Sequence, residues 1–189
     1  MLEYYKIPNV REICHRVKEG DRAALKEMAA SILKDNFIPE RSILIPAPSH
    51  TGRATYTLEL SRLIAEKTGA KVQDILRCKP HISRYEEKKR GIDSKFEFYL
   101  IRPLIKADKT FFVDNVISTG KTFSAARELI GNTLIPLVYS IDSTRVDKKY
   151  FKGVDMYVNQ QSNFSRSSYC RCNNEANSEQ HRNAFQSCH

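Results

Sequence analysis

Two runs of apolar residues open the chain, each with the spacing i, i+3, i+4 and i+7 that gathers side chains on one face of a helix. The first run is Val10, Ile13, Cys14 and Val17, and the second is Leu25, Met28, Ala29 and Ile32. Asp21 precedes the second run and is a favourable N-cap residue. The pattern predicts two amphipathic helices in the first third of the chain.

Short apolar runs then alternate with further helical patterns. Strands are predicted over 42–45, 71–76, 110–113, 134–141 and 154–158, and helices over 56–64 and 123–130, with Gly69 and Gly131 as the stops. Strands separated by helices of this length are typical of βαβ units. The predicted fold is therefore α/β, with a mainly parallel twisted sheet flanked by helices. Because such sheets bind ligands at the carboxyl ends of their strands, the loops there are the candidate functional segments.

Composition changes near residue 159. The segment 159–189 holds six Asn, four Gln and six Ser but no Ile, Leu or Val, so it cannot bury enough apolar area to offset the entropy of ordering it. A chain of 189 residues suits one domain. We therefore predict a folded domain over 1–158 and a disordered polar tail over 159–189.

The chain has a formal charge of +9, and the tail, with three Arg and two Glu, accounts for only +1 of it. The basic domain permits a nucleic-acid partner through phosphate contacts, although it shows no recognised binding motif. No apolar run approaches the roughly 18 residues of a membrane span, and the charged N-terminus leaves no room for a signal peptide. We expect a cytoplasmic protein with no membrane partner and with its five cysteines reduced.

The tail contains thiolate and imidazole groups, which are the usual ligands of zinc. They are Cys170, Cys172, His181, Cys188 and His189. Their spacing matches none of the common paired zinc knuckles. A metal site in the tail and an unstructured tail remain alternatives.

The most informative loop lies between the predicted strand 110–113 and the next helix. Ser118, Thr119, Gly120, Lys121 and Thr122 place small hydroxyl residues and a glycine where backbone N–H groups are free and the helix dipole is positive, which suits one phosphate group. Asp114 at the strand end cannot itself stabilise a bound phosphate, because both groups are negatively charged. It can accept hydrogen bonds from hydroxyl groups, or hold a hydrated cation, on the same ligand. The combination predicts a sugar phosphate.

The segment 113–122, Val-Asp-Asn-Val-Ile-Ser-Thr-Gly-Lys-Thr, resembles the signature of the type I phosphoribosyltransferases. The resemblance covers about residues 43–142, and the layout is most similar to the competence-associated branch of that family. It implies that Asp114 holds the ribose hydroxyls of phosphoribosyl pyrophosphate and that 118–122 hold its 5-phosphate. Asn115 stands where the family usually has a second acidic residue, so the implied catalytic pair is Asp114 and Asn115.

The same residues also fit a second motif. Asn115 to Thr122 reads Asn-x-x-x-x-Gly-Lys-Thr, a nucleotide P-loop in which Asn replaces the first glycine. That interpretation gives Asp114 no role. A degenerate P-loop therefore remains an alternative to the sugar-phosphate site.

Two further segments take positions that matter in this family. The loop after the predicted strand 42–45 contains Ser49, His50, Thr51, Gly52 and Arg53, and the resemblance implies that this loop binds pyrophosphate. The polar segment 77–95 carries seven Lys and Arg and lies where the family has a flexible flap that closes over the substrate. Its candidate residues are Arg84, Lys88, Lys89 and Arg90, and of these Arg84 and Lys88 are expected to act in catalysis. A solvated charged surface is the alternative for this segment.

The resemblance implies a transferase that binds phosphoribosyl pyrophosphate and Mg²⁺. It would pass the phosphoribosyl group to a nitrogen acceptor, which the sequence does not identify, and release pyrophosphate. Mg²⁺ would be held by substrate oxygens and water, with no direct protein ligand except Asp114 acting through water. The alternative is a module that senses phosphoribosyl pyrophosphate or a nucleotide without catalysis. The sequence leaves a homodimer open.

Overall fold

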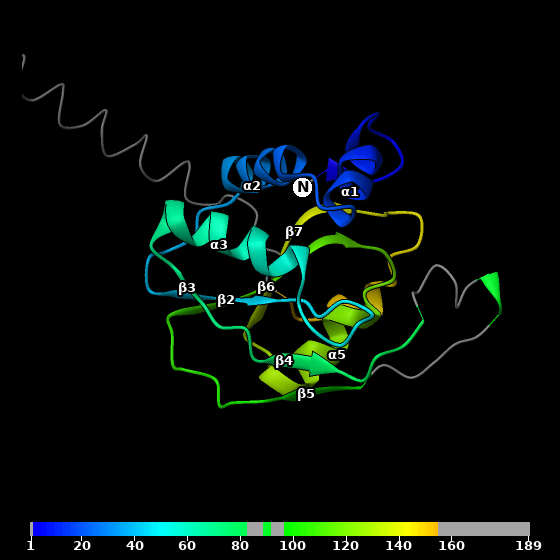
Figure 1. Ribbon diagram of the computed structural model, residues 1–189. Helices are drawn as coiled ribbons and strands as arrows, with labels where there is room; N and C mark the ends of the chain where they lie inside the picture. The colour runs from blue at the N-terminus through cyan, green and yellow to red at the C-terminus, as the bar shows by residue number, and fades with distance from the viewer. Residues whose placement is uncertain (1, 83–88, 92–96, 155–189) are drawn as a thin grey trace, which may run out of the picture. The chain divides into compact units, whose positions relative to one another are not determined.

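The structure, a computed structural model, describes residues 2–82, 89–91 and 97–154 (Figure 1). Its main sheet has five strands in the order β1-β7-β6-β2-β3, and every neighbouring pair is parallel. The strands are β1 (Leu2–Glu3), β2 (Ser42–Pro46), β3 (Lys71–Val72), β6 (Lys109–Ile117) and β7 (Leu134–Ile141). The predicted α/β class and mainly parallel sheet are confirmed.

Helices cover both faces of this sheet (Figure 1). They are α1 (Val10–Lys18), α2 (Arg22–Asp35), α3 (Tyr56–Thr68) and α5 (Lys121–Ile130), followed by the 3₁₀ helix η1 (Lys148–Phe151). One face packs against α1, α2 and α3. The other packs against α5 and an antiparallel pair, β4 (Leu76–Cys78) with β5 (Phe98–Leu100).

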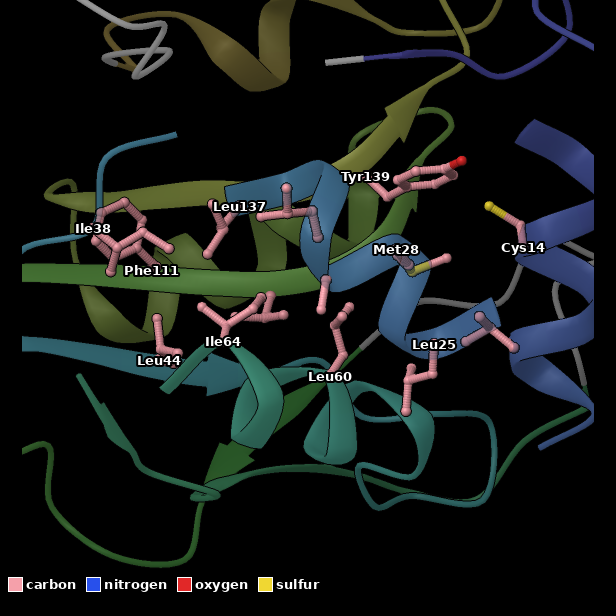
Figure 2. Packing of buried hydrophobic residues seen from close by; sticks show 14 of the residues in the cluster. Cys14, Leu25, Met28, Ile38, Leu44, Leu60, Ile64, Phe111, Leu137 and Tyr139 are labelled. Atoms are coloured by element: carbon pink, nitrogen blue, oxygen red, sulfur yellow. The ribbon is translucent and has the colours of Figure 1, made fainter. Parts of the chain in front are cut away.

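Side chains alternate between the two faces, as a strand requires. Phe111 and Val113 of β6 belong to the core under α1–α3, whereas Phe112 belongs to the core under α5. Figure 2 shows Leu60 and Ile64 of α3 meeting the first of these cores. Because both faces are buried, the central strands are almost continuously apolar.

The helix ends follow the chemistry expected from the sequence. The Asp21 carboxylate accepts hydrogen bonds from the N–H groups of Ala23 (2.8 Å) and Ala24 (3.1 Å) and so caps α2. Gly69 ends α3 with φ 75°, a left-handed conformation that glycine adopts at little cost.

Several predicted boundaries were wrong. β6 continues past Val113 to Ile117, because Val116 and Ile117 pair with Ser140 and Ile141 of β7. The single strand predicted over 71–76 is two strands, β3 and β4, which belong to different sheets. β1 and η1 were not predicted. Of the strand predicted over 154–158, residues 155–158 lie outside the described residues, as does the whole predicted tail 159–189.

The strand order places a topological switch point between β2 and β6. From β2 the chain passes through α3 to β3 on one side, while β6 lies on the other side of β2 and leads into α5 on the opposite face. The loops that follow β2 and β6 therefore diverge. A crevice at the carboxyl ends of two such strands is where open α/β sheets bind ligands.

Across the described ranges, no helix has both the length and the apolar character that crossing a bilayer requires.

Candidate functional site

Asp114 lies near the carboxyl end of β6, at the switch point. Its side chain is half-buried, and Oδ1 accepts a hydrogen bond of 2.8 Å from the N–H of Asn115. Burial raises the pKa of Asp114 to about 6, although that hydrogen bond and the charge of Lys18 act in the opposite direction. Ionising the carboxyl is therefore costly, and a ligand that donates hydrogen bonds to it would offset that cost.

This raised pKa predicts a pH-dependent stability. Ionising Asp114 opposes folding, and the penalty is absent below the pKa of about 3.9 of an unfolded Asp and complete above the folded pKa of about 6. We expect Asp114→Asn to raise the free energy of unfolding by about 2 kcal/mol at pH 8 and to leave it nearly unchanged at about pH 3.5. Urea titrations at the two pH values measure the difference.

The control for that measurement is Asp108→Asn. Asp108 precedes β6, and its exposed carboxylate forms a surface ion pair with Arg41 at 3.5 Å, a type of contact that contributes little to stability. If both variants respond equally to pH, burial of Asp114 does not set the pH dependence.

Asn115, the predicted partner of Asp114, is turned into the protein. Only 2% of its surface is exposed, and its Oδ1 accepts a hydrogen bond of 3.2 Å from the hydroxyl of Tyr56. Its Nδ2 is buried and has no hydrogen-bond partner among the described residues. Successive residues of a strand point to opposite faces, so Asp114 and Asn115 do not converge on one point. The structure thus brings Asn115 to α3 and leaves Asp114 at the rim.

The buried environment of Asn115 extends to α1. The hydroxyl of Ser140 donates to the Asn115 carbonyl at 3.3 Å and lies 3.7 Å from the thiol sulfur of Cys14. Burial raises the pKa of Cys14 to about 11, against the opposing effect of the Ser140 hydrogen bond. Cys14 is therefore a packed thiol within a structural polar cluster, as the sequence pattern indicated.

The loop after β6 retains free donors. Gly120 is the N-cap of α5 with φ 92°, and the hydroxyl of Thr119 accepts from the N–H of Lys121 at 3.3 Å. Among the described residues, the backbone N–H groups of Thr119, Gly120 and Thr122 donate no hydrogen bond. Three amide groups at the start of a ten-residue helix can bind one anion.

Helix η1 fixes this loop from outside. The N–H of Asp147 donates to the Thr119 carbonyl at 3.2 Å. The Phe151 ring stacks on Phe123 of α5, with centroids 5.5 Å apart and planes 5° from parallel. A Cβ atom on Gly120 would lie 2.6 Å from Phe151 Cε2. The loop conformation therefore depends on a residue with no side chain at position 120.

The loop after β2 begins alongside β6, because the N–H of Ala47 donates to the carbonyl of Val113 at 2.9 Å. Three of its own donors are used internally: the N–H of Ser49 bonds to the Arg53 carbonyl, and those of Thr51 and Gly52 bond to Ser49. His50 and Arg53 have exposed side chains. The exposed side chains of His50 and Arg53 are therefore available to an anion, whereas the N–H groups of Ser49, Thr51 and Gly52 are not.

The predicted flap is described only in part. Arg84 and Lys88 lie outside the described residues, while Lys89 and Arg90 are exposed. Arg77 at the start of the segment belongs to β4 and forms an ion pair of 2.6 Å with Asp74. The two flap residues predicted to act in catalysis remain a prediction.

Sequence patterns did not single out Tyr56 or Lys18 as site residues. Tyr56 is the first residue of the helix predicted over 56–64, and its hydroxyl donates to Asn115, 59 positions away in sequence. Lys18 ends α1 and its charge acts on Asp114. Both connections join elements that are distant in the chain, and no local signal marks them.

Two observations bear on other sites. A cavity of about 570 Å³ lies at the amino ends of β6 and β7, between Lys109, Thr110 and Leu134, at the opposite edge of the sheet from Asp114. In the described part of the chain, no group of three or more His, Cys, Asp or Glu residues could hold a metal ion. The Asp114 carboxylate is an acidic group at the switch point that could contact a cation through water.

The fold and the candidate site together define an α/β protein with a mainly parallel sheet, in which Asp114 and the loop 118–120 lie at the switch point. In comparisons with known proteins, no family model and no curated protein matches the chain.

Proposed function

We propose that the protein is a type I phosphoribosyltransferase. It would bind phosphoribosyl pyrophosphate with Mg²⁺ and transfer the phosphoribosyl group to a nitrogen acceptor. The observation that carries this proposal is that Asp114, near the carboxyl end of β6, is followed directly by the amide-rich loop 118–122, while the loop after β2 begins alongside β6. A sugar phosphate needs a hydrogen-bond acceptor for its hydroxyl groups and N–H donors for its phosphate group. Residues 114 and 118–122 supply the two within one short segment of the chain.

Each group has a role in this reaction. Asp114 accepts hydrogen bonds from the ribose hydroxyls, and the N–H groups of Thr119, Gly120 and Thr122 hold the 5-phosphate. Arg53 and His50 lie on the neighbouring loop and favour the negative charge of the leaving pyrophosphate. The acceptor nitrogen forms a bond to C1 as the bond from C1 to the pyrophosphate oxygen breaks, and the nitrogen then loses its proton.

The protein contributes mainly by positioning the sugar and stabilising the departing charge. Mg²⁺ bound to the substrate's phosphate oxygens would supply further neutralisation of that charge. The donor set fits this arrangement, since one half-buried carboxylate at the rim can contact the ion through water.

The P-loop alternative fits the described chain less well. A P-loop needs the residues from 115 to 120 to wrap around a phosphate. Here Val116 and Ile117 pair with β7, and Asn115 is buried under α3. Only Ser118, Thr119 and Gly120 remain between strand and helix, which is enough for one phosphate group.

A second candidate is a sensor that binds phosphoribosyl pyrophosphate without turnover. The burial of Asn115 favours it, since the rim then has one carboxylate where the resembled family usually has an acidic pair. The internal hydrogen bonds of the loop after β2 also favour it, because they occupy donors that would otherwise face the pyrophosphate.

Calorimetry and a turnover assay separate these candidates. We expect phosphoribosyl pyrophosphate with Mg²⁺ to bind the full chain and to raise its melting temperature. Release of pyrophosphate with any member of a panel of nucleobases and amines supports the transferase. Binding without release across the panel supports the sensor, and absence of binding contradicts both.

A further inference from the structure

A second cavity, of about 460 Å³, lies on the α1–α3 face of the sheet. It is formed by the end of α1, the first two turns of α2 and the start of α3. Its volume is within the range of about 300–1,000 Å³ that is usual for small-molecule sites. The proposed sugar-phosphate site does not use this cavity.

The cavity has apolar walls on three elements. These walls are Val17 of α1, Leu25 of α2, and Tyr56 and Leu63 of α3. Figure 2 shows Leu25 at this side of the core, where α2 approaches α3. The hydroxyl of Tyr56 is engaged by Asn115. The walls therefore favour an apolar body about the size of one ring.

The charged residues of the cavity are unbalanced. Lys18, Arg22 and Lys26 are exposed at its rim, and within the described chain none of them forms an ion pair with a carboxylate. The acidic residues of the same cavity already form ion pairs with other residues. Asp21 is paired with Arg16 at 2.7 Å and caps α2, and Glu59 is paired with Arg62 at 2.5 Å. Three cations that form no ion pair among the described residues favour an anionic group on the occupant.

We propose that this cavity is a second ligand site, which binds a small organic anion consisting of a ring-sized apolar body and a carboxylate. The apolar walls would bury the ring, and Lys18, Arg22 and Lys26 would hold the carboxylate at the rim. The site communicates with the switch point through two of its own residues, since Tyr56 bonds to Asn115 and the charge of Lys18 acts on Asp114. An occupant there would therefore alter the surroundings of Asp114.

Three simple probes test the proposal on the full chain, without phosphoribosyl pyrophosphate or Mg²⁺. Benzoate carries both required features, benzamide is its neutral analogue, and inorganic phosphate is an anion without a ring. In amide NMR titrations we expect benzoate to give saturable shifts at Gly20–Lys26 and at Tyr56. Benzamide and phosphate should each bind at least about tenfold more weakly.

Variants test the location. The double variant Arg22→Gln/Lys26→Gln should weaken benzoate binding by about tenfold or more. Lys34→Gln should not, because Lys34 is an exposed lysine near the other end of the same helix and outside the cavity. Folding of each variant is checked by its unperturbed amide spectrum.

Three results would overturn the proposal: no saturable benzoate shift up to about 10 mM, equal affinity for benzoate and benzamide, or equal losses in the double variant and in Lys34→Gln. The proposed transferase function fails separately, because it is measured with phosphoribosyl pyrophosphate. Benzoate binding that survives in a chain unable to bind phosphoribosyl pyrophosphate leaves this second site intact.

Discussion

Asp114→Asn is expected to abolish measurable binding of phosphoribosyl pyrophosphate while leaving the protein folded. The carboxylate would accept two hydrogen bonds from the ribose, and hydrogen bonds to a charged group contribute about 1.5–3 kcal/mol each. The amide keeps one acceptor oxygen but loses the charge and presents N–H donors toward hydroxyl groups. We therefore expect the affinity to fall by a factor of about 100 or more, measured by calorimetry in the presence of Mg²⁺.

The same variant is expected to be more stable than the wild type near neutral pH, because burial disfavours the ionised carboxylate. Loss of binding together with increased stability would show that Asp114 serves ligand binding at a cost to the stability of the fold. Asp108→Asn, which removes the same charge from an exposed ion pair, should bind normally. Unchanged affinity in Asp114→Asn would remove Asp114 from the site and the main support for a phosphoribosyltransferase.

The helices and the central strands could be predicted because their signals are local. The residues of the first helical run, Val10, Ile13, Cys14 and Val17, are all buried on one face of α1. Asp21 and Gly69 also act where their chemistry places them, at a helix start and a helix end. Spacing and caps depend only on neighbours within about two turns of a helix, so sequence alone is sufficient.

The end of β6 could not be predicted in the same way. A polar pair, Asp114 and Asn115, is a reasonable sign that a strand has ended. The strand nevertheless continues, because the pairing of Val116 and Ile117 with β7 and the hydroxyl of Tyr56 make burial of Asn115 possible. Those partners are residues 56, 140 and 141. They are distant in sequence, so the local pattern around 114–117 does not indicate them.

This difference changes the interpretation of the candidate site. As a loop, 114–117 could have turned both Asp114 and Asn115 toward one sugar. As a strand, it separates them onto opposite faces, and the hydroxyl acceptor at the rim is Asp114 with its charge and its raised pKa of about 6. The predicted phosphate loop is shortened to 118–120 and the start of α5, which increases its dependence on the backbone conformation of Gly120.

Gly120→Ala is the second substitution with a large expected effect. Gly120 has φ 92°, and a Cβ atom there would meet Phe151 Cε2 at 2.6 Å and Tyr150 Cβ at 3.2 Å. The backbone strain costs roughly 1–2 kcal/mol, and displacement of Phe151 from its stacking on Phe123 adds to it. We expect the free energy of unfolding to fall by about 2–4 kcal/mol and phosphate binding by 118–122 to be lost, as measured by urea titration and calorimetry.

The matched control is Gly20→Ala, because Gly20 also has φ 92° but a Cβ atom there meets nothing within 4 Å. It should show the backbone cost alone and leave the binding of phosphoribosyl pyrophosphate intact. The difference between the two variants isolates the contact with η1. In the Phe151→Ala background, Gly120→Ala should cost less, by about 1 kcal/mol, than in the wild type, since the obstructing ring is gone. An equal cost in both backgrounds would show that η1 does not hold the loop, and that the shape of the phosphate cradle is set within 118–122 alone.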